Sequence, residues 1–99
     1  RMETSAEGVA TRVPFALTMD ILRDGLADFT LVSEDAIGDA VARLFTEERI
    51  VMEGACGTAV AAALGADDIA GETVVVPVSG RNIDAGKLDA VLTEYGDTV

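Results

Sequence analysis

The 99-residue sequence contains no histidine, one cysteine and one lysine, and each absence excludes a kind of site. Without histidine the chain has no Ser-His-Asp triad. One thiol, Cys56, allows neither an intrachain disulfide nor a zinc site of several thiolates, and we expect no metal centre. The glycine patterns of a nucleophile elbow, a P-loop and a dinucleotide-binding turn are also missing. The residues alone therefore reveal no familiar catalytic constellation.

Basic residues are few, because seven Lys and Arg stand against 18 Asp and Glu, which gives a net charge of −11. Such a chain repels nucleic-acid phosphates and anionic lipid, so we expect neither nucleic acid nor a membrane as a partner. The acids are scattered and do not gather in a tail. They indicate either an acidic interaction surface or, as we favour, a solvated surface suited to the high salt of a halophilic source.

Long apolar runs are missing as well. No stretch approaches the roughly 20 residues of a membrane span, and the first residues lack the apolar centre of a signal peptide. We therefore expect a cytoplasmic protein. Apolar residues still make up 49% of the chain, and aromatic residues only 4%, which suits a single α/β domain of modest size.

Helix and strand signals alternate along the chain. The apolar spacing after Pro14 predicts a helix that includes Phe15 and ends near Leu26, and Ser33 is the expected N-cap of a second helix. Three apolar segments are predicted strands, and a small-residue turn over 53–57 leads into a helix over 58–64. The predicted strands are 29–32, 50–52 and 73–78. With a last helix that buries Leu88, Val91 and Leu92, this order predicts an α/β layer fold with mostly parallel strands.

Polar and glycine residues follow two of these predicted strands. Glu53-Gly54 comes after the strand 50–52, and Ser79-Gly80 comes after the strand 73–78. In open α/β sheets ligands bind beyond the carboxyl ends of the strands, and glycine allows a ligand to approach the backbone closely. The pattern predicts a small-ligand site at these two strand ends.

Four segments, in order, resemble the fold-type II enzymes that depend on pyridoxal phosphate (PLP). The resemblance covers Thr4 to Leu92 and points to the threonine/serine dehydratase (threonine ammonia-lyase) and serine racemase family. The segments are 4–8 (TSAEG), 31–37 (LVSEDAI), 50–62 (IVMEGACGTAVAA) and 74–84 (VVVPVSGRNID). The resemblance implies a partial three-layer sandwich with mostly parallel strands, and it makes residues 1–99 a single C-terminal segment of the PLP-binding catalytic domain.

The resemblance also implies site residues. Ser79 would place its hydroxyl against the pyridine nitrogen of PLP, where a neutral partner leaves the cofactor a moderate electron sink suited to β-elimination. Gly80 and Asn82 would line the same wall, and Glu53 would lie near the cofactor. Glu7 and Gly8 would form part of a loop on the substrate side.

Each of these assignments has a plainer alternative. Ser79 could be an ordinary turn or cap serine, and Glu53 could simply stabilise the start of the next helix. Three residues depart from the family pattern: Cys56 replaces Gly or Ala, Arg81 replaces the second Gly of S-G-G-N, and Glu7 replaces Asp. We interpret Cys56 as a small buried apolar residue.

Arg81 is read in two ways. As a surface cation it would pair with Asp84. As the alternative, Arg81 would contact the substrate carboxylate. We favour the surface pair with Asp84.

The parent enzyme implied by this family would dehydrate and deaminate threonine or serine to a 2-oxo acid and ammonia. Threonine and serine, and dehydration and racemisation, remain open. The family's Schiff-base lysine and phosphate cradle do not occur here, and Lys87 is read as a solvated helix lysine. We therefore expect no catalytic residue in this chain, no activity of the chain alone, and a missing N-terminal half or a neighbouring subunit as its partner in a homo-oligomeric parent. The alternative is an inactive, stand-alone acidic α/β binding module.

Overall fold

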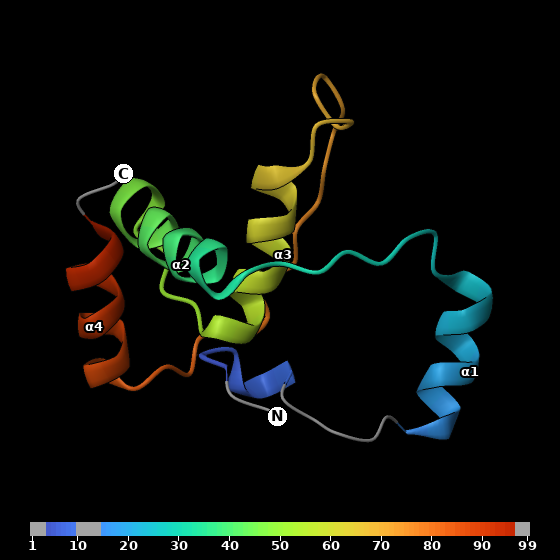
Figure 1. Ribbon diagram of the computed structural model, residues 1–99, viewed down its shortest axis with the longest axis horizontal. Helices are drawn as coiled ribbons and strands as arrows, with labels where there is room; N and C mark the ends of the chain where they lie inside the picture. The colour runs from blue at the N-terminus through green and yellow to red at the C-terminus, as the bar shows by residue number, and fades with distance from the viewer. Residues whose placement is uncertain (1–3, 10–14, 97–99) are drawn as a thin grey trace.

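A computed structural model describes residues 4–9 and 15–96. These residues form a short 3-10 helix and four α-helices, which are η1 (Glu7–Val9), α1 (Ala16–Gly25), α2 (Glu34–Glu48), α3 (Gly54–Gly65) and α4 (Ala85–Tyr95). Helix α2 packs against α3 and α4, and η1 lies against α3. Helix α1 packs against none of the other described helices and stands apart from them (Figure 1).

The bounds of α2 are set by a cap at each end. The Ala36 amide donates to the Ser33 hydroxyl oxygen at 3.1 Å, which confirms Ser33 as the predicted N-cap. At the other end Arg49 adopts the left-handed conformation, with φ 58°. The Arg49 amide donates to the Phe45 carbonyl at 3.1 Å, which is the 5→1 bond of an αL cap, and the Ile50 amide donates to the Leu44 carbonyl at 3.0 Å.

The core lies between α2, α3 and the segment that joins them. Its buried side chains are Ala40, Val41, Met52, Cys56, Val60 and Ala61. Helix α4 begins at Asp84, whose carboxylate accepts from the Gly86 amide at 2.9 Å. Leu88 and Val91 of α4 pack against the core, as the sequence predicts, and both remain partly exposed.

The predicted strands are not formed. No β-strand occurs in residues 4–9 and 15–96, and the segments 29–32, 50–52 and 73–78 run without regular pairing. One backbone hydrogen bond, from the Glu53 amide to the Gly80 carbonyl at 3.0 Å, joins the ends of two of them. A strand exists only through the ladder it makes with neighbours, and pairs of strands without a wider sheet are marginal. The partial three-layer sandwich is thus absent from this part of the chain.

The start of α3 also differs from the prediction. Residues 53–57 were expected to form a turn before a helix over 58–64, whereas α3 begins at Gly54 and ends at Gly65. The Cys56 and Gly57 amides both donate to the Glu53 carbonyl, so the helical bonding begins at once. The small residues of this segment are therefore the first turn of the helix.

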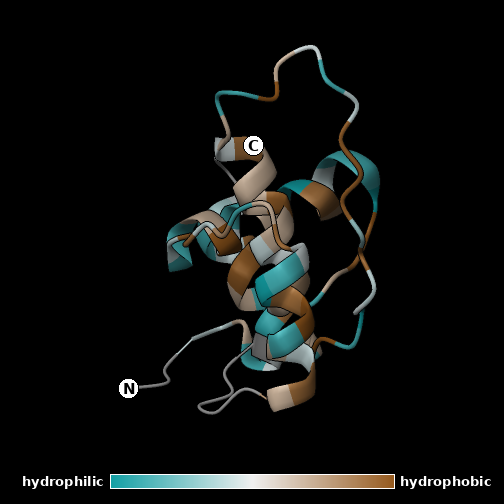
Figure 2. Ribbon diagram, turned by 90° about the vertical axis from the view of Figure 1, so that its right-hand side faces the viewer, coloured by the Kyte–Doolittle hydropathy of each residue, from teal (hydrophilic) through white to brown (hydrophobic). Residues whose placement is uncertain are grey.

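Large apolar side chains are exposed on α1 and on the segments that were expected to be strands. In Figure 2 apolar residues, in brown, run along the chain outside the helices. The exposed large apolar side chains are Phe15, Leu17, Ile21, Leu22, Leu26, Phe29, Leu31, Leu64, Val74 and Val75. Leu31 and Val75 keep 86% and 85% of their surface in solvent, which a stable sheet would cover. None of the helices in the described ranges is long and apolar enough to span a membrane.

Candidate functional site

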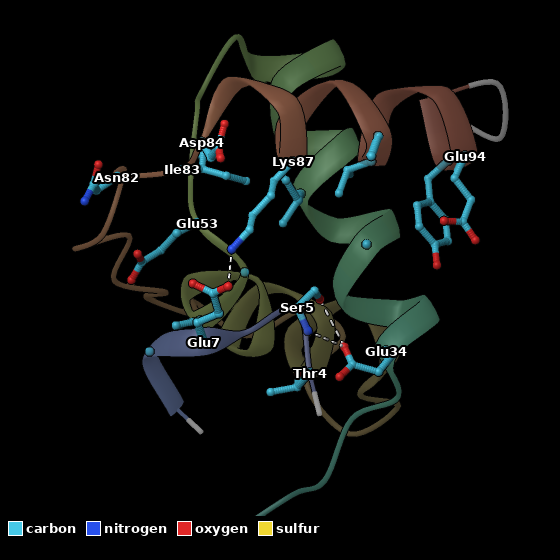
Figure 3. A pocket seen from close by; sticks show the side chains of 18 residues that line it. Thr4, Ser5, Glu7, Glu34, Glu53, Asn82, Ile83, Asp84, Lys87 and Glu94 are labelled. Atoms are coloured by element: carbon cyan, nitrogen blue, oxygen red, sulfur yellow. Dashed lines mark hydrogen bonds and ion pairs between the residues drawn. The ribbon is translucent and has the colours of Figure 1, made fainter. Parts of the chain in front are cut away.

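A cavity of about 730 Å³ opens between η1, the start of α3, α2 and α4 (Figure 3). Its size lies within the range of small-molecule sites. Three stretches far apart in the sequence meet there, namely residues 4–8, 53–55 and 82–84. Four of the predicted site residues line it: Glu7, Gly8, Glu53 and Asn82. The two other predicted site residues, Ser79 and Gly80, do not.

Ser79 and Gly80 lie in the loop that carries the lining residue Asn82. Ser79 is exposed. Gly80 contacts Glu53, and a Cβ at Gly80 would come within 2.5 Å of the Glu53 Oε1 atom. Because Glu53 itself lines the cavity, its side chain connects the cavity with the loop 79–82, and glycine at position 80 is what allows so close an approach.

An ion pair crosses the mouth of the cavity. The Lys87 ammonium, on the first turn of α4, donates to the Glu7 carboxylate of η1. Figure 3 shows the Lys87 side chain extending from α4 towards Glu7. Both side chains are at least half exposed, so the pair contributes little to stability, about 0–1 kcal/mol. Its main effect is to join the segment of Glu7 and Gly8, which was expected on the substrate side, to α4.

A second link fastens the same segment to α2. The Ser5 hydroxyl donates to the Glu34 carboxylate at 3.0 Å, and the Ser5 amide lies 3.4 Å from the same oxygen. Hydrogen bonds from the hydroxyls of Thr4 and Ser5 lower the pKa of Glu34 below its ordinary value of 4.5. The ionised carboxylate thus holds residues 4–5 at the edge of the cavity.

Tyr95 closes the far side of the cavity. Its hydroxyl donates to Asp35 of α2 at 2.8 Å. That hydrogen bond, together with burial and the nearby negative charges, raises the pKa of Tyr95 to about 12. The neutral phenol therefore acts as a fixed donor between α4 and α2.

A family described as "Pyridoxal-phosphate dependent enzyme" matches residues 1–80. The chain belongs to this family. The match includes Glu7, Gly8 and Glu53 from the cavity, and also Ser79 and Gly80. Enzymes of this family are α/β proteins that depend on pyridoxal phosphate, which confirms the cofactor expected from the resemblance.

Curated relatives of this chain carry related names. An "L-threonine ammonia-lyase" from Thermotoga maritima is 33% identical over 91 residues, which is 92% of this chain and 23% of the relative. A protein of the same name from Geobacter sulfurreducens is 37% identical over 95 residues, or 94% of this chain and 23% of the relative. An "L-threonine dehydratase catabolic TdcB" from Staphylococcus aureus is 35% identical over 97 residues, or 94% and 28%. The chain thus spans about a quarter of the length of these relatives. No solved structure matches the chain significantly.

The charges of the cavity decide which part of PLP the chain fits. Lys87 is its only cationic lining residue among those described, and it is paired with Glu7. The acidic lining residues are Glu7, Glu34, Glu53, Asp84 and Glu94. This wall repels a phosphate. The amide of Asn82, which lines the cavity, is a neutral group suited to the polar edge of the ring, so the lining fits the ring and not the phosphate.

Three residues of this site were not predicted from the sequence. Lys87 was interpreted as a solvated helix lysine, but it lines the cavity and pairs with Glu7. Its position three residues after the N-cap Asp84 places it on the first turn of α4, next to the loop that carries Asn82. Ser5 and Tyr95 carried no signal, because their importance depends on contacts with α2 that join residues 29 and 60 positions apart.

Proposed function

We propose that this chain is the C-terminal segment of the catalytic domain of a PLP-dependent threonine/serine ammonia-lyase. The observation that carries the proposal is that a single cavity is lined by Glu7, Gly8, Glu53 and Asn82, with Gly80 in contact with Glu53. These residues come from three of the segments that resemble the family. The names of the relatives at 33–37% identity support threonine as a substrate.

In this proposal the chain supplies one wall of the active site. Ser79 holds the pyridine nitrogen of the cofactor through a neutral hydrogen bond, and Asn82 lies on the same wall. When bound, pyridoxal phosphate would draw electrons from the amino acid, which would eliminate water; a water molecule would then hydrolyse the released imine, so that the net products are a 2-oxo acid and ammonia. Glu7, fixed by Lys87, orients the loop on the substrate side. The reactive lysine and the phosphate cradle belong to the rest of the catalytic domain.

The exposed apolar surface supports the fragment proposal. Leu31 and Val75 are more than four-fifths exposed, and α1 has no helical partner in the described chain. We propose that 29–32, 50–52 and 73–78 become strands of an α/β sandwich when the remainder of the domain provides their neighbours. The relatives are long enough to provide it, because the chain covers only 23–28% of their length. The homo-oligomeric parent, the cytoplasmic location and the halophilic source remain predictions.

A chimera tests this function directly. In it, the chain replaces the matching 91 residues of the Thermotoga maritima relative. We expect the purified chimera to bind PLP and to release ammonia from L-threonine or L-serine, and the isolated chain to do neither. Ser79→Ala should accelerate loss of the cofactor, whereas Thr93→Ala, an exposed hydroxyl on α4, serves as the matched control.

Three results would contradict the proposal in part or in whole. A chimera that binds PLP with unchanged dissociation in Ser79→Ala would remove the role of Ser79. An isolated chain that forms a borohydride-reducible adduct, lost in Lys87→Ala, would mean that Lys87 is the reactive lysine and that this chain has its own cofactor site. A chimera that folds without binding the cofactor would favour the binding-module alternative.

A further inference from the structure

Two residues that depart from the family pattern link the loop 79–82 to residues 51–56. The Cys56 sulfur accepts a hydrogen bond from the Gly80 amide at 3.0 Å. The Arg81 Nε donates to the Val51 carbonyl at 3.2 Å. The backbone bond from the Glu53 amide to the Gly80 carbonyl, at 3.0 Å, lies between them. The loop 79–82 is therefore tied to residues 51–56 at three points.

The sulfur is well placed to fix the loop. Cys56 lies in the first turn of α3, is 8% exposed and belongs to the core with Val41 and Met52. Its position therefore follows that of the helix. A thiol sulfur is a weak acceptor, but an amide hydrogen left without a partner in a partly buried place costs more than a weak bond loses. The sulfur thus makes one position of the Gly80 backbone preferable to others.

Arg81 acts at the other end of the loop. Its guanidinium reaches back to the backbone of the segment before α3, and so it neither pairs with Asp84 in the described structure nor points into the cavity lining. The Val51 carbonyl would be paired by a neighbouring strand in a regular sheet. Arg81 supplies a donor for it without a strand ladder.

We infer that Cys56 and Arg81 are positioning residues that hold the loop 79–82 against the start of α3. The clamp fixes where Ser79 and Asn82 stand relative to the cavity. Its meaning for the cofactor rests on the proposed function, whereas the restraint on the loop does not. Neither residue contacts the substrate in this assignment.

Amide hydrogen exchange of the chain tests the restraint without any cofactor. In Cys56→Ala the Gly80 amide loses its acceptor, and we expect its exchange to accelerate roughly three- to tenfold, as for the loss of one hydrogen bond. Cys56→Ser keeps an acceptor and should restore part of the protection. The decisive amide is that of Glu53, whose own acceptor is untouched. It should exchange faster in both Cys56→Ala and Arg81→Gly, because the Gly80 carbonyl moves away with the loop.

Val60→Ala is the matched control, because it removes a side chain of the same helix that is also 8% exposed. It should accelerate exchange throughout α3 without singling out Glu53 and Gly80. The inference fails if the Gly80 amide of the unsubstituted chain exchanges like an unstructured peptide. It also fails if Glu53 responds alike in Val60→Ala, Cys56→Ala and Arg81→Gly.

A second arm separates the clamp from the proposed function. In the chimera, Cys56→Ala and Arg81→Gly should release PLP several-fold faster than Val60→Ala does. If the exchange results hold but cofactor release is unchanged, the restraint on the loop is confirmed and its role in positioning the cofactor is overturned. If the chimera binds no PLP at all, the proposed function fails, and the exchange experiment still decides whether the loop is clamped.

Discussion

The two end glycines of α3 should respond in opposite ways to the same substitution. Gly54, the first residue of the helix, is buried, and a Cβ there would collide with the Ser5 carbonyl oxygen and lie 3.0 Å from the Ala6 Cα. Gly65, the last residue, is exposed, and a Cβ there would meet nothing within 4 Å. Alanine is favoured over glycine in helices by up to about 1 kcal/mol. The contacts alone therefore decide the sign.

The size of the change in unfolding free energy depends on which atoms must move to accommodate the new methyl group. At Gly54 the obstacle is backbone, which cannot turn aside as a flexible side chain can, so the overpacking cost falls towards the upper part of the usual ~1–3 kcal/mol. Subtracting the gain in helix propensity leaves Gly54→Ala destabilised by about 1–2 kcal/mol. Gly65→Ala should be unchanged or stabilised by up to about 1 kcal/mol. The two variants should thus differ by about 1–3 kcal/mol.

Urea unfolding followed by far-UV circular dichroism measures this difference. A second measurement identifies the cause, because the new methyl group can be accommodated by lifting residues 4–8 from α3. In that event the Ser5–Glu34 hydrogen bond is lost, and the Glu34 pKa should rise towards its ordinary 4.5 in Gly54→Ala but not in Gly65→Ala. Equal unfolding midpoints for the two variants, with an unchanged Glu34 pKa in both, would refute the packing of this segment.

Three further predictions concern charge. The lowered pKa of Glu34 stabilises the fold above pH 4.5 and this contribution is lost as the pH falls through the folded value, so Ser5→Ala should reduce the unfolding midpoint at neutral pH more than in acid. Because the pKa of Tyr95 is raised to about 12, its neutral phenol stabilises the fold below pH 10, and this stabilisation is lost between pH 10 and about 12. Asp35→Asn should move the absorbance titration of the phenolate down towards pH 10. With a net charge of −11, the unfolding midpoint should rise from low to molar KCl, and an unchanged midpoint would contradict a salt-adapted source.

The helices could be predicted because their signals are local. Ser33 caps α2 through a contact three residues away, and Leu88 and Val91 follow the helical period. The start of α3 was misplaced because Gly54 and Gly57 normally weaken a helix, whereas here their missing side chains let residues 5–6 and α2 approach. At the start of α3, tertiary packing outweighs the low helix propensity of glycine.

The predicted strands could not be confirmed because a strand forms only when neighbouring strands pair with it. The apolar run 73–78 carries the strongest strand signal in the sequence, yet Val75 remains 85% exposed in the described chain. Likewise the sequence indicated that Glu53 and Asn82 share a site, but it could not indicate Lys87, whose partner Glu7 is 80 residues away. Contacts of that range are decided by tertiary packing alone.

The acidity of the cavity explains how such a wall can serve an enzyme whose cofactor is anionic. A single paired cation among five carboxylates does not favour a phosphate, so under the proposed function the phosphate would be bound by the other part of the catalytic domain. The amino group of an amino-acid substrate, by contrast, is cationic and is attracted by the same wall. The two charges of the bound molecules would then be separated across the site, with the phosphate held on one side and the ring edge, through Ser79 and Asn82, on the other. Under the proposed function, this division would give the chain a share in orienting the ring while the reactive lysine comes from the rest of the domain.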